Sequence, residues 1–490
     1  MQKYLLYIVV FICGAMVMIL ELVASRILAP FVGTSSYVWT SLIGIILGSL
    51  SFGYWLGGRL ADRNPKRFAL AMILFNAAIF IGATTFINIL VLSVIEQYIS
   101  DIRIAAIIST LVLFSFPSVL LGMVSPYAVK LQMADIDKTG STVGNLYAIS
   151  TIGSIVGTFL AGFVLIPSFG SEKNLLIISI VLLFTSFIVY FDKGFKLNIL
   201  FFIILIMTLL IPNPAFLVYG KTDLKDIDTE YSRIWIYPTY YENKEVKVFQ
   251  TGNEYSSAMY LNNDELVFEY TKYYDLAEHF NTGFNKALML GGAAYSYPKY
   301  YLNKYTNATI DVAEIDSRVT DIAKSEFRLK NNPRLRIFHE DGRIFLNKTK
   351  NKYDVIYGDA FRSKSVPYQL TTKDAVEKMY NVLNDNGVVV INIISSIEGD
   401  KGKFFRGEYK TYKNIFPQVY VFPVEGIKNG EEIQNIMLVA LKSKDKPSFE
   451  STDSELNEYL AHLWKEEIPN DIPILTDDYS PVEYYTMGIR

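Results

Sequence analysis

The sequence predicts a multi-pass α-helical membrane domain fused to an α/β Rossmann-like domain with a small N-terminal β-unit. Two observations support this fold class. The chain is almost continuously apolar up to about residue 212, whereas its charged residues, 19% of the total, concentrate after about residue 220. From residue 286 onward, short strands alternate with helical segments, which indicates a mainly parallel sheet covered on both faces. We therefore expect a membrane domain over 1–216, a linker and β-unit over 217–284, and the α/β domain over 285–490.

The apolar half contains several stretches that are long enough to cross a bilayer, which takes about 20 residues. They predict six or seven membrane helices. The last is the weakest, because it runs into Pro212-Asn213-Pro214. The stretches lie near 4–24, 38–58, 68–95, 103–128, 146–167, 174–191 and 197–216.

Glycines recur at short spacings in the second and fifth stretches, among them Gly53 and Gly57, and Gly153 and Gly157. Such spacing permits close approach of helix backbones. The alternative is that glycine is simply frequent in membrane helices.

Glu21 and Arg26 lie at the end of the first stretch. An ionisable group at membrane depth is a functional candidate by default. We favour the alternative, an interfacial Glu–Arg pair that holds two helices together.

The orientation of the chain follows from its basic residues. The segment 59–67 is the most basic loop of the apolar half, so it should face the cytoplasm. Seven crossings would then place the α/β domain outside, away from cytosolic nucleosides. For this reason we favour an even number of crossings, a cell-membrane location and a cytoplasmic α/β domain.

Composition argues against several other functions. The net charge of −3 and the lack of a basic stripe argue against nucleic-acid binding. The single cysteine, Cys13, excludes an intramolecular disulfide, and the three histidines show no metal-ligand spacing. We therefore expect no metal.

The region 228–280 has the pattern of a small antiparallel β-unit. We expect strands at 232–237, 246–249 and 258–261, a hairpin turn at 262–264 and a helix near 270–281. In the α/β domain we expect helices near 317–328, 342–348 and 372–383. The expected strands are 287–290, 309–313, 335–338, 353–357, 388–392, 419–422 and 436–440.

Polar or small residues end four successive strands of this domain. Gly291 and Gly292 end the first, Glu314 the second, Asp341 follows the third, and Asp359 ends the fourth. Ligands of such sheets bind at the carboxyl ends of the strands. Each residue alone also fits a turn or a helix N-cap. Together they favour a nucleoside site, in which Glu314 accepts hydrogen bonds from the ribose hydroxyls and Asp341 from the adenine amine.

At these residues the chain resembles the spermidine synthase family, within the fold of S-adenosylmethionine-dependent methyltransferases. The segment 313–316 is similar to the family's ribose-binding strand end, and Asp341-Gly342 to its adenine-binding turn. The segment 353–359 is similar to the strand whose terminal carboxylate lies at the active site. The membrane half resembles that of bacterial fused transporter-like/spermidine synthases, through Glu21 with Ser25-Arg26, through 57–63, and through the terminal 475–483.

Two positions depart from the family's pattern. Its glycine loop reads Gly-Gly-Gly-Asp-Gly, whereas this chain has Gly291-Gly292-Ala293-Ala294-Tyr295 and lacks the acid that helps to hold the donor's amine. The family's active-site loop carries two aspartates three apart, whereas this chain has Asp359 followed by Arg362. Arginine suits an anion, and Arg362 is equally compatible with a surface position. Tyr368 and Gln369 fit the family's pattern and are candidate substrate contacts.

The resemblance implies a membrane-bound transferase that uses S-adenosylmethionine or its decarboxylated form as donor. Gly291, Gly292, Glu314, Asp341 and Gly342 would hold the nucleoside. The transferred group would be aminopropyl, and the acceptor an amine.

Asp359 would orient or deprotonate the acceptor. Two alternatives stay open: a methyltransferase that acts on a lipid or anionic metabolite, and a non-catalytic nucleoside or polyamine sensor or transporter. The expected partners are the small-molecule acceptor and the bilayer, without nucleic acid, and a homo-oligomer is compatible with the sequence.

Overall fold

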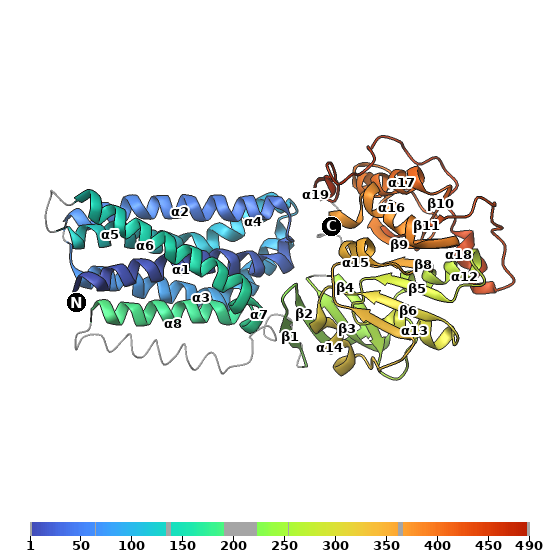
Figure 1. Ribbon diagram of the computed structural model, residues 1–490, viewed down its shortest axis with the longest axis horizontal. Coiled ribbons are helices and arrows are strands. Elements are labelled where there is room, and N and C mark those ends of the chain that lie inside the picture. The colour runs from blue at the N-terminus through green and yellow to red at the C-terminus, as the bar shows by residue number, and fades with distance from the viewer. Residues whose placement is uncertain are drawn as a thin grey trace. The chain divides into compact units, whose positions relative to one another are not determined.

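The computed structural model describes residues 2–63, 65–133, 139–190, 223–252, 254–360 and 366–487. The chain divides into two compact units. One comprises Met1–Thr222 with Asp226–Arg233, and the other comprises Asp223–Lys225 with Ile234–Arg490. Figure 1 shows helices in the first unit and a mixture of strands and helices in the second.

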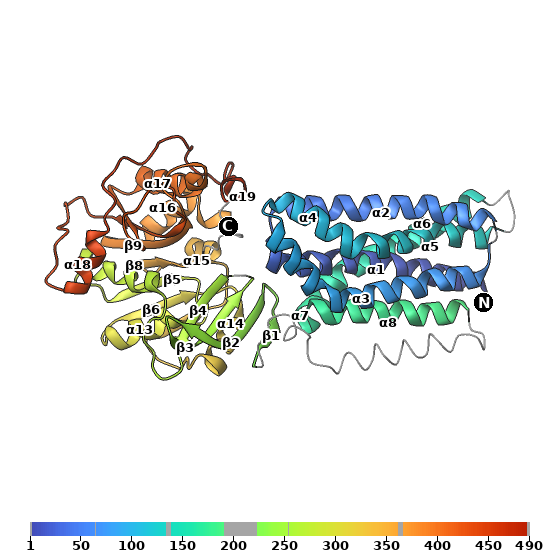
Figure 2. The same ribbon diagram turned by 180° about the vertical axis from the view of Figure 1, so that it is seen from behind.

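Six helices of the first unit are long and apolar enough to cross a membrane. They correspond to six of the seven predicted stretches, and the seventh, 197–216, lies outside the described residues. Figure 2 shows them side by side along one common direction. Their elements are α1 (Gln2–Val32), α2 (Ser36–Arg63), α3 (Arg67–Tyr98), α4 (Ile102–Thr110), η1 (Leu111–Ser115), α5 (Phe116–Gln132), α6 (Thr139–Leu160), η3 (Ala161–Leu165), α7 (Ile166–Phe169) and α8 (Ser171–Val189).

The fourth and fifth of these helices are interrupted by short π-helical turns, η1 and η3. A proline follows each turn: Pro117 lies at the start of α5 and Pro167 at the start of α7. Pro117 has no N–H to donate to the carbonyl of Leu113, one turn earlier. The Thr84 hydroxyl of α3 donates to that carbonyl instead, at 3.3 Å, so the irregular turn is held by a neighbouring helix.

The segment Asp226–Arg233 belongs to the first unit because its charges pair with helix ends. The Arg233 guanidinium donates to Glu172 of α8 at 2.7 Å. Asp228 accepts from the Ser171 N–H at 2.6 Å and pairs with Arg26 of α1 at 3.4 Å. The predicted Glu–Arg pair is therefore wrong, because the acidic partner of Arg26 is Asp228, which lies far from it in the sequence.

A four-stranded sheet forms the β-unit, in the order β1-β2-β3-β4. Its strands are β1 (Lys225–Asp228), β2 (Arg233–Tyr241), β3 (Lys244–Thr251) and β4 (Glu254–Tyr260). Glu242 and Asn243 turn the chain between β2 and β3 with φ of 47° and 64°, as a two-residue hairpin requires. The predicted hairpin turn at 262–264 is wrong, because these residues follow the last strand of the sheet.

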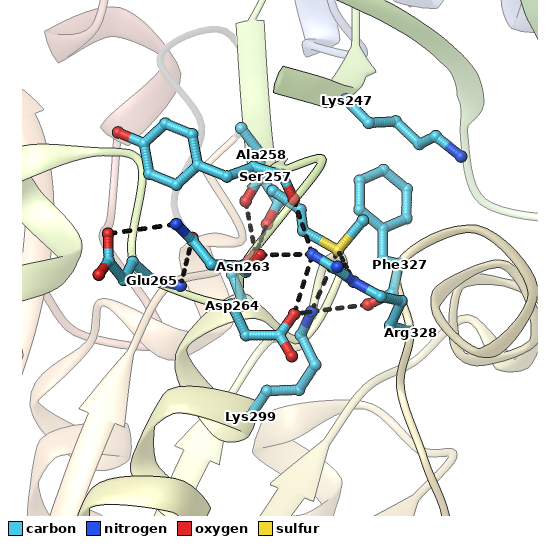
Figure 3. A network of polar contacts seen from close by, with 12 residues as sticks. Lys247, Ser257, Ala258, Asn263, Asp264, Glu265, Lys299, Phe327 and Arg328 are labelled. Carbon is cyan, nitrogen blue, oxygen red and sulfur yellow. Dashed lines mark hydrogen bonds and ion pairs between the residues drawn. The ribbon is translucent and has the colours of Figure 1, made fainter. Parts of the chain in front are cut away.

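The segment after β4 is instead held by two basic side chains (Figure 3). Arg328 pairs with Asp264 at 3.2 Å and donates to the Tyr260 carbonyl at 2.6 Å. Lys299 donates to the Phe327 carbonyl at 2.6 Å, and burial lowers the pKa of its ammonium. These contacts join the end of the β-unit to the α/β domain.

The main sheet has seven strands in the order β10-β11-β9-β8-β5-β6-β7. Five neighbours, β9 to β7, are parallel, and β11 runs antiparallel to both β9 and β10. All seven predicted strands are present. They are β5 (Lys286–Leu290), β6 (Thr309–Ala313), β7 (Leu335–Phe338), β8 (Tyr353–Gly358), β9 (Leu383–Ser395), β10 (Gln418–Pro423) and β11 (Gln434–Leu441).

Helices cover this sheet, and the three predicted ones are present as α14, α15 and α16. The helix expected near 270–281 is broken into α11, η4 and α12, while α13 and α17 were not predicted. The bounds are α11 (Glu269–Lys272), η4 (Tyr273–Asp275), α12 (Leu276–Phe280), α13 (Ser296–Lys304), α14 (Ser317–Glu326), α15 (Gly342–Lys348), η5 (Tyr368–Leu370), α16 (Lys373–Val382), η6 (Asp400–Gly402), α17 (Lys403–Ile415), α18 (Ser454–Ala461) and α19 (Val482–Tyr485).

Candidate active site

The strand order reverses at β5, because β6 and β7 extend the sheet on one side and β8 lies on the other. Ligands of open α/β sheets bind at such a point. Here the Asp359 N–H donates to the Leu290 carbonyl at 3.0 Å, and the Gly291 N–H to the Ala313 carbonyl at 2.9 Å. The ends of β5, β6 and β8 are thus held against each other.

Gly291 needs to be glycine at this junction. Its φ is +91°, and a Cβ there would lie 2.9 Å from the Asp359 carbonyl oxygen. A side chain would therefore be strained in conformation and would also push β5 and β8 apart.

Glu314 is buried at the end of β6, with 8% of its surface exposed. Its Oε2 accepts from the Gly292 N–H and its Oε1 from the Asp316 N–H, both at 2.9 Å. The carboxylate therefore holds the glycine loop to β6. A carboxylate has about four acceptor positions, so it can also accept hydrogen bonds from hydroxyl groups of a ligand.

Asp341 is the N-cap of α15. Its Oδ1 accepts from the N–H groups of Arg343 and Ile344, at 2.8 and 3.1 Å. Its Oδ2 accepts from the Gln369 side chain at 3.2 Å. The structure shows this capping role directly, and Gly342 is the first residue of the helix.

The C-terminal segment packs against the same helix. Asp477 accepts from Arg343 at 2.7 Å and from the Thr372 hydroxyl at 2.6 Å. Arg343 also donates to the Gln369 carbonyl at 3.1 Å. The terminal 475–483 segment thereby fixes the residues that surround Asp341.

Asp359 is half-buried at the end of β8. Its Oδ2 accepts from the Tyr270 hydroxyl at 3.4 Å, and its Oδ1 from the Asn392 amide at 3.5 Å. The Tyr274 hydroxyl donates to the adjacent Gly358 carbonyl at 3.3 Å. Burial raises the pKa of Asp359 to about 6, against the opposing effect of the neighbouring Asn392 amide and of the Tyr274 and Tyr270 hydroxyls.

Three of these neighbours were missed by sequence reasoning. Tyr270 comes from α11 and Tyr274 from η4, both before the first strand of the main sheet, and Asn392 comes from β9. The strand-end rule pointed only to carboxylates and glycines. Extending the strand-end rule to amides would have found Asn392, whereas nothing local marks the two tyrosines.

The altered glycine loop has a defined packing. Tyr295 has φ +57° and is fully buried. Its hydroxyl bonds to the Thr320 hydroxyl at 2.7 Å, and that hydroxyl bonds to His339 at 3.0 Å. A Cβ on Gly292 would lie 2.8 Å from the Tyr295 ring, so the ring leaves no room for a side chain at position 292.

The remaining candidates divide into two groups. Gln369 contacts Asp341, whereas Tyr368 is 54% exposed in η5. Arg362 lies outside the described residues. Within the part of the chain that the structure describes, no group of His, Cys, Asp or Glu has the arrangement of a metal site.

Comparison with known proteins gives a match for this part of the chain. Residues 274–429 match the model of the spermine/spermidine synthase domain. The polyamine aminopropyltransferase of Vibrio vulnificus is 25% identical over 219 residues, covering 41% of this chain and 70% of its own length. The probable polyamine aminopropyl transferase of Bifidobacterium longum is 28% identical over 222 residues, covering 41% of this chain and 49% of its own length.

Among solved structures, a probable spermidine synthase from Corynebacterium glutamicum is 20% identical with a TM-score of 0.44, and covers 54% of this chain and 94% of that one. The domain match includes Glu314, Asp341 and Asp359. Residues 274–429 are therefore similar to a spermine/spermidine synthase domain, and this chain carries in addition an N-terminal region of long apolar helices.

Proposed function

We propose that the protein is a membrane-bound aminopropyltransferase, which transfers the aminopropyl group of decarboxylated S-adenosylmethionine to an amine. The names of its relatives support the reaction class. The observation that carries the proposal is Asp359, a half-buried carboxylate with a pKa of about 6 beside the glycine loop. A base with such a pKa is mostly ionised at neutral pH and accepts protons readily.

The donor's nucleoside would lie over the ends of β5, β6 and β7. Gly291 and Gly292 allow close approach of the backbone, and Glu314 would accept from the ribose hydroxyls. Asp341 would accept from the adenine amine with the lone pairs that its capping bonds leave free. Gly342, the next residue, has no side chain and would leave room for the adenine ring. These assignments rest on the strand-end geometry and on the domain match.

The reaction itself requires an unprotonated amine and in-line geometry. The amine nitrogen attacks the donor's CH₂ group next to the sulfonium, a C–N bond forms and the C–S bond breaks. The bonding electrons return to sulfur, which leaves as a neutral thioether. Asp359 takes the proton that the amine gives up, and Tyr270 and Asn392 hold the carboxylate in place. Alignment supplies most of the rate.

A second candidate is methyl transfer from S-adenosylmethionine to a lipid or anionic metabolite. The specific observation in its favour is Ala294, a buried apolar residue where the family has an acid for the donor's amine. A non-catalytic sensor is the third reading of the altered loop. Arg362, by its charge, and Tyr368 and Gln369, by their position, are proposed acceptor or donor contacts.

The location of the enzyme is also a proposal. Six long apolar helices are compatible with a multi-pass membrane protein, and we propose the cell membrane with the catalytic domain in the cytoplasm. This orientation reverses the one expected from the basic segment 59–67, because Asp226–Arg233 contacts the ends of α1 and α8 that lie opposite to that segment. Membrane domain, linker with β-unit, and catalytic domain would follow the limits 1–216, 217–284 and 285–490. Thiol labelling of single cysteines introduced at Lys66 and at Glu466, in intact cells and after lysis, tests the orientation.

The decisive test of the reaction uses the purified full chain in nanodiscs. Calorimetric titration compares S-adenosylmethionine with its decarboxylated form, and mass spectrometry then identifies the product formed from each donor with a set of amines. Tighter binding of the decarboxylated donor and an aminopropylated amine are expected. Transfer of methyl alone would replace this proposal by the second candidate. Binding of neither donor would contradict both.

A further inference from the structure

The six long helices of the first unit form two sets of three with the same packing. The first set is α1, α2 and α3, and the second is α4–η1–α5, α6–η3–α7 and α8. In this unit α1 packs along α6, α2 along α5, and α3 along α8. Suppose that each helix is exchanged with the helix at the same position in the other set. The α1–α6 pair then becomes the pair of α5 and α2, and the α3–α8 pair is unchanged. Because each set makes three crossings, the two sets run in opposite directions.

The two exchanged pairs are close-packed at corresponding residues. A Cβ on Gly53 of α2 would lie 2.2 Å from the Val119 carbonyl oxygen of α5. A Cβ on Gly153 of α6 would lie 2.0 Å from the Phe11 carbonyl oxygen of α1. Both helix crossings therefore exist only because a side chain is absent.

The correspondence continues along both crossings. One turn later, a Cβ on the next glycine would lie 2.6 Å from the backbone of the facing helix in one pair and 2.5 Å in the other. In each pair a glycine of the facing helix makes the same close approach in return. The matched contacts are Gly57 with Met123 and Gly157 with Ala15, then Gly122 with Leu50 and Gly14 with Ser150. Such repetition at six glycines marks an inverted internal repeat and not the general frequency of glycine in membrane helices.

A buried polar group lies where the two sets join. Thr85 and Asn88 belong to α3, the last helix of the first set, and Ser109 to α4, the first element of the second. Thr85 is 5% exposed, and Asn88 and Ser109 are fully buried. Among the described residues, Thr85 Oγ1, Asn88 Oδ1 and Ser109 Oγ have no hydrogen-bond partner.

The register of α3 and α4 brings Asn88 and Ser109 to one level. Thr84 contacts Leu113 through its hydroxyl. Asn88 lies one turn after Thr84, and Ser109 one turn before Leu113 on the antiparallel neighbour. The Asn88 amide nitrogen donates to the carbonyls of Thr84 and Thr85 at 3.0 and 2.8 Å, so its oxygen is left as an acceptor only.

The position of this polar group fits a transport site. Thr85 and Asn88 lie in the C-terminal half of α3, and Ser109 lies on α4 just before η1, where the helix departs from α-helical pitch. Inverted repeats with interrupted helices, and a polar site at the interface between the repeats, are the design of many secondary transporters. Polar side chains at this depth are otherwise costly.

We propose that the helical unit is an inverted-repeat carrier in which Asn88, Thr85 and Ser109 bind an ammonium group of the amine that it moves across the bilayer. An oxygen that can only accept selects a ligand that donates hydrogen bonds, and an ammonium group donates three. The choice of a linear diamine or polyamine rests on the proposed function. Transport itself does not depend on the transferase reaction.

The experiment uses the full chain reconstituted in liposomes, without any methionine-derived donor. Counterflow of labelled putrescine and labelled spermidine is measured against protein-free liposomes. Saturable uptake of one of them is expected, and Asn88→Leu should lower it at least tenfold. Asn76→Leu is the matched control, because Asn76 also lies on α3 and bonds to its own helix but is only half-buried. Uptake that is unaffected by Asn88→Leu would overturn the site.

A milder variant separates binding from folding. Ser109→Ala removes a buried hydroxyl that has no partner in the described structure, so the melting temperature should stay the same or rise. The concentration of amine at half-maximal uptake should nevertheless increase severalfold. An unchanged half-saturation would assign the hydroxyl to packing or to a buried water and would contradict the proposed site.

The repeat is tested by paired substitutions. Gly53→Ala and Gly153→Ala should slow uptake to a similar extent, since each forces apart one of two equivalent crossings. Gly44→Ala and Gly144→Ala are controls, because a Cβ at either position meets nothing within 4 Å. If only one of Gly53→Ala and Gly153→Ala slowed uptake, the two crossings would not be equivalent. A folded protein that transfers aminopropyl groups but takes up neither amine would overturn the carrier and leave the proposed reaction intact.

Discussion

The Tyr270 hydroxyl donates a 3.4 Å hydrogen bond to Oδ2 of Asp359 and so links α11 to the end of β8. On the other side, the Asn392 amide contacts Oδ1 at 3.5 Å and itself accepts from the Asn435 amide at 3.0 Å. The carboxylate is thus oriented by two different layers of the domain. Its pKa of about 6 is the balance between burial, which raises it, and these donors, which lower it.

Replacing Asp359 by Asn should reduce turnover far more than donor binding. The amide keeps the size and most hydrogen bonds of the carboxylate but accepts no proton, so kcat should fall roughly 10²–10³-fold. The dissociation constant of the donor should change less than threefold. Asp385→Asn, at an exposed position on β9, is the control. Steady-state kinetics and titration calorimetry measure both quantities, and equal losses in both would contradict the assigned role.

The pH dependence of kcat/KM should report the same carboxyl group. Activity should be low when Asp359 is protonated and should rise with pH through about 6, the pKa of the folded enzyme. Tyr270→Phe removes a hydrogen bond that lowers this pKa, so the rising limb should move to higher pH. A limb that stays in place in the Tyr270→Phe variant would exclude the hydroxyl as a contributor.

The close approach of β5 and β8 predicts a large effect of one methyl group. Gly291→Ala combines a φ of +91° with a contact of 2.9 Å to the Asp359 carbonyl oxygen. It should weaken donor binding at least tenfold by displacing the glycine loop. Gly283→Ala is the matched control, since nothing lies within 4 Å of its Cβ. Titration calorimetry with the donor tests this on both variants. Similar donor affinities of the two variants would show that the loop accommodates the added methyl group.

A buried carboxyl group on α17 predicts a stabilising substitution. Glu408 is fully buried, and neither of its side-chain oxygens has a hydrogen-bond partner among the described residues. Burial raises its pKa well above the ordinary value. As the pH rises above about 4.3, the unfolded chain releases this proton while the folded protein retains it, so stability falls. Glu408→Gln removes this loss and should stabilise the protein by roughly 1–3 kcal/mol.

The matching measurement is thermal unfolding of Glu408→Gln at pH 5 and pH 8. The gain in melting temperature should be larger at pH 8, where the unfolded chain of the unsubstituted protein is fully ionised. Glu466→Gln, at an exposed position, is the control and should show no such difference. A gain that is equal at both pH values would show that Glu408 has an ordinary pKa in the folded state.

The strands of the α/β domain were predictable because their apolar runs are short and bounded by polar turns. The helix α13 was not, since its tyrosines and lysines show weak apolar periodicity. The helix α17 was missed although its pattern is strongly amphipathic, and the hairpin at Glu242-Asn243 carries no glycine to mark it. The candidate nucleoside residues were found because strand ends share one edge of a parallel sheet. The seventh apolar segment, 197–216, and Arg362 lie outside the described residues, so these predictions stand as they were made.

The sequence by itself determined an apolar helical half, an alternating α/β half, and the order of Gly291, Glu314, Asp341 and Asp359 along it. These features depend on local periodicity and on turns, which neighbouring residues specify. Only the tertiary structure decided that Tyr270 and Asn392 hold Asp359, and that Arg26 pairs with Asp228. It also revealed the matched glycine contacts of the two three-helix sets. Such contacts join residues far apart in the chain, and their distances are set by the packing of whole elements, which no local pattern records.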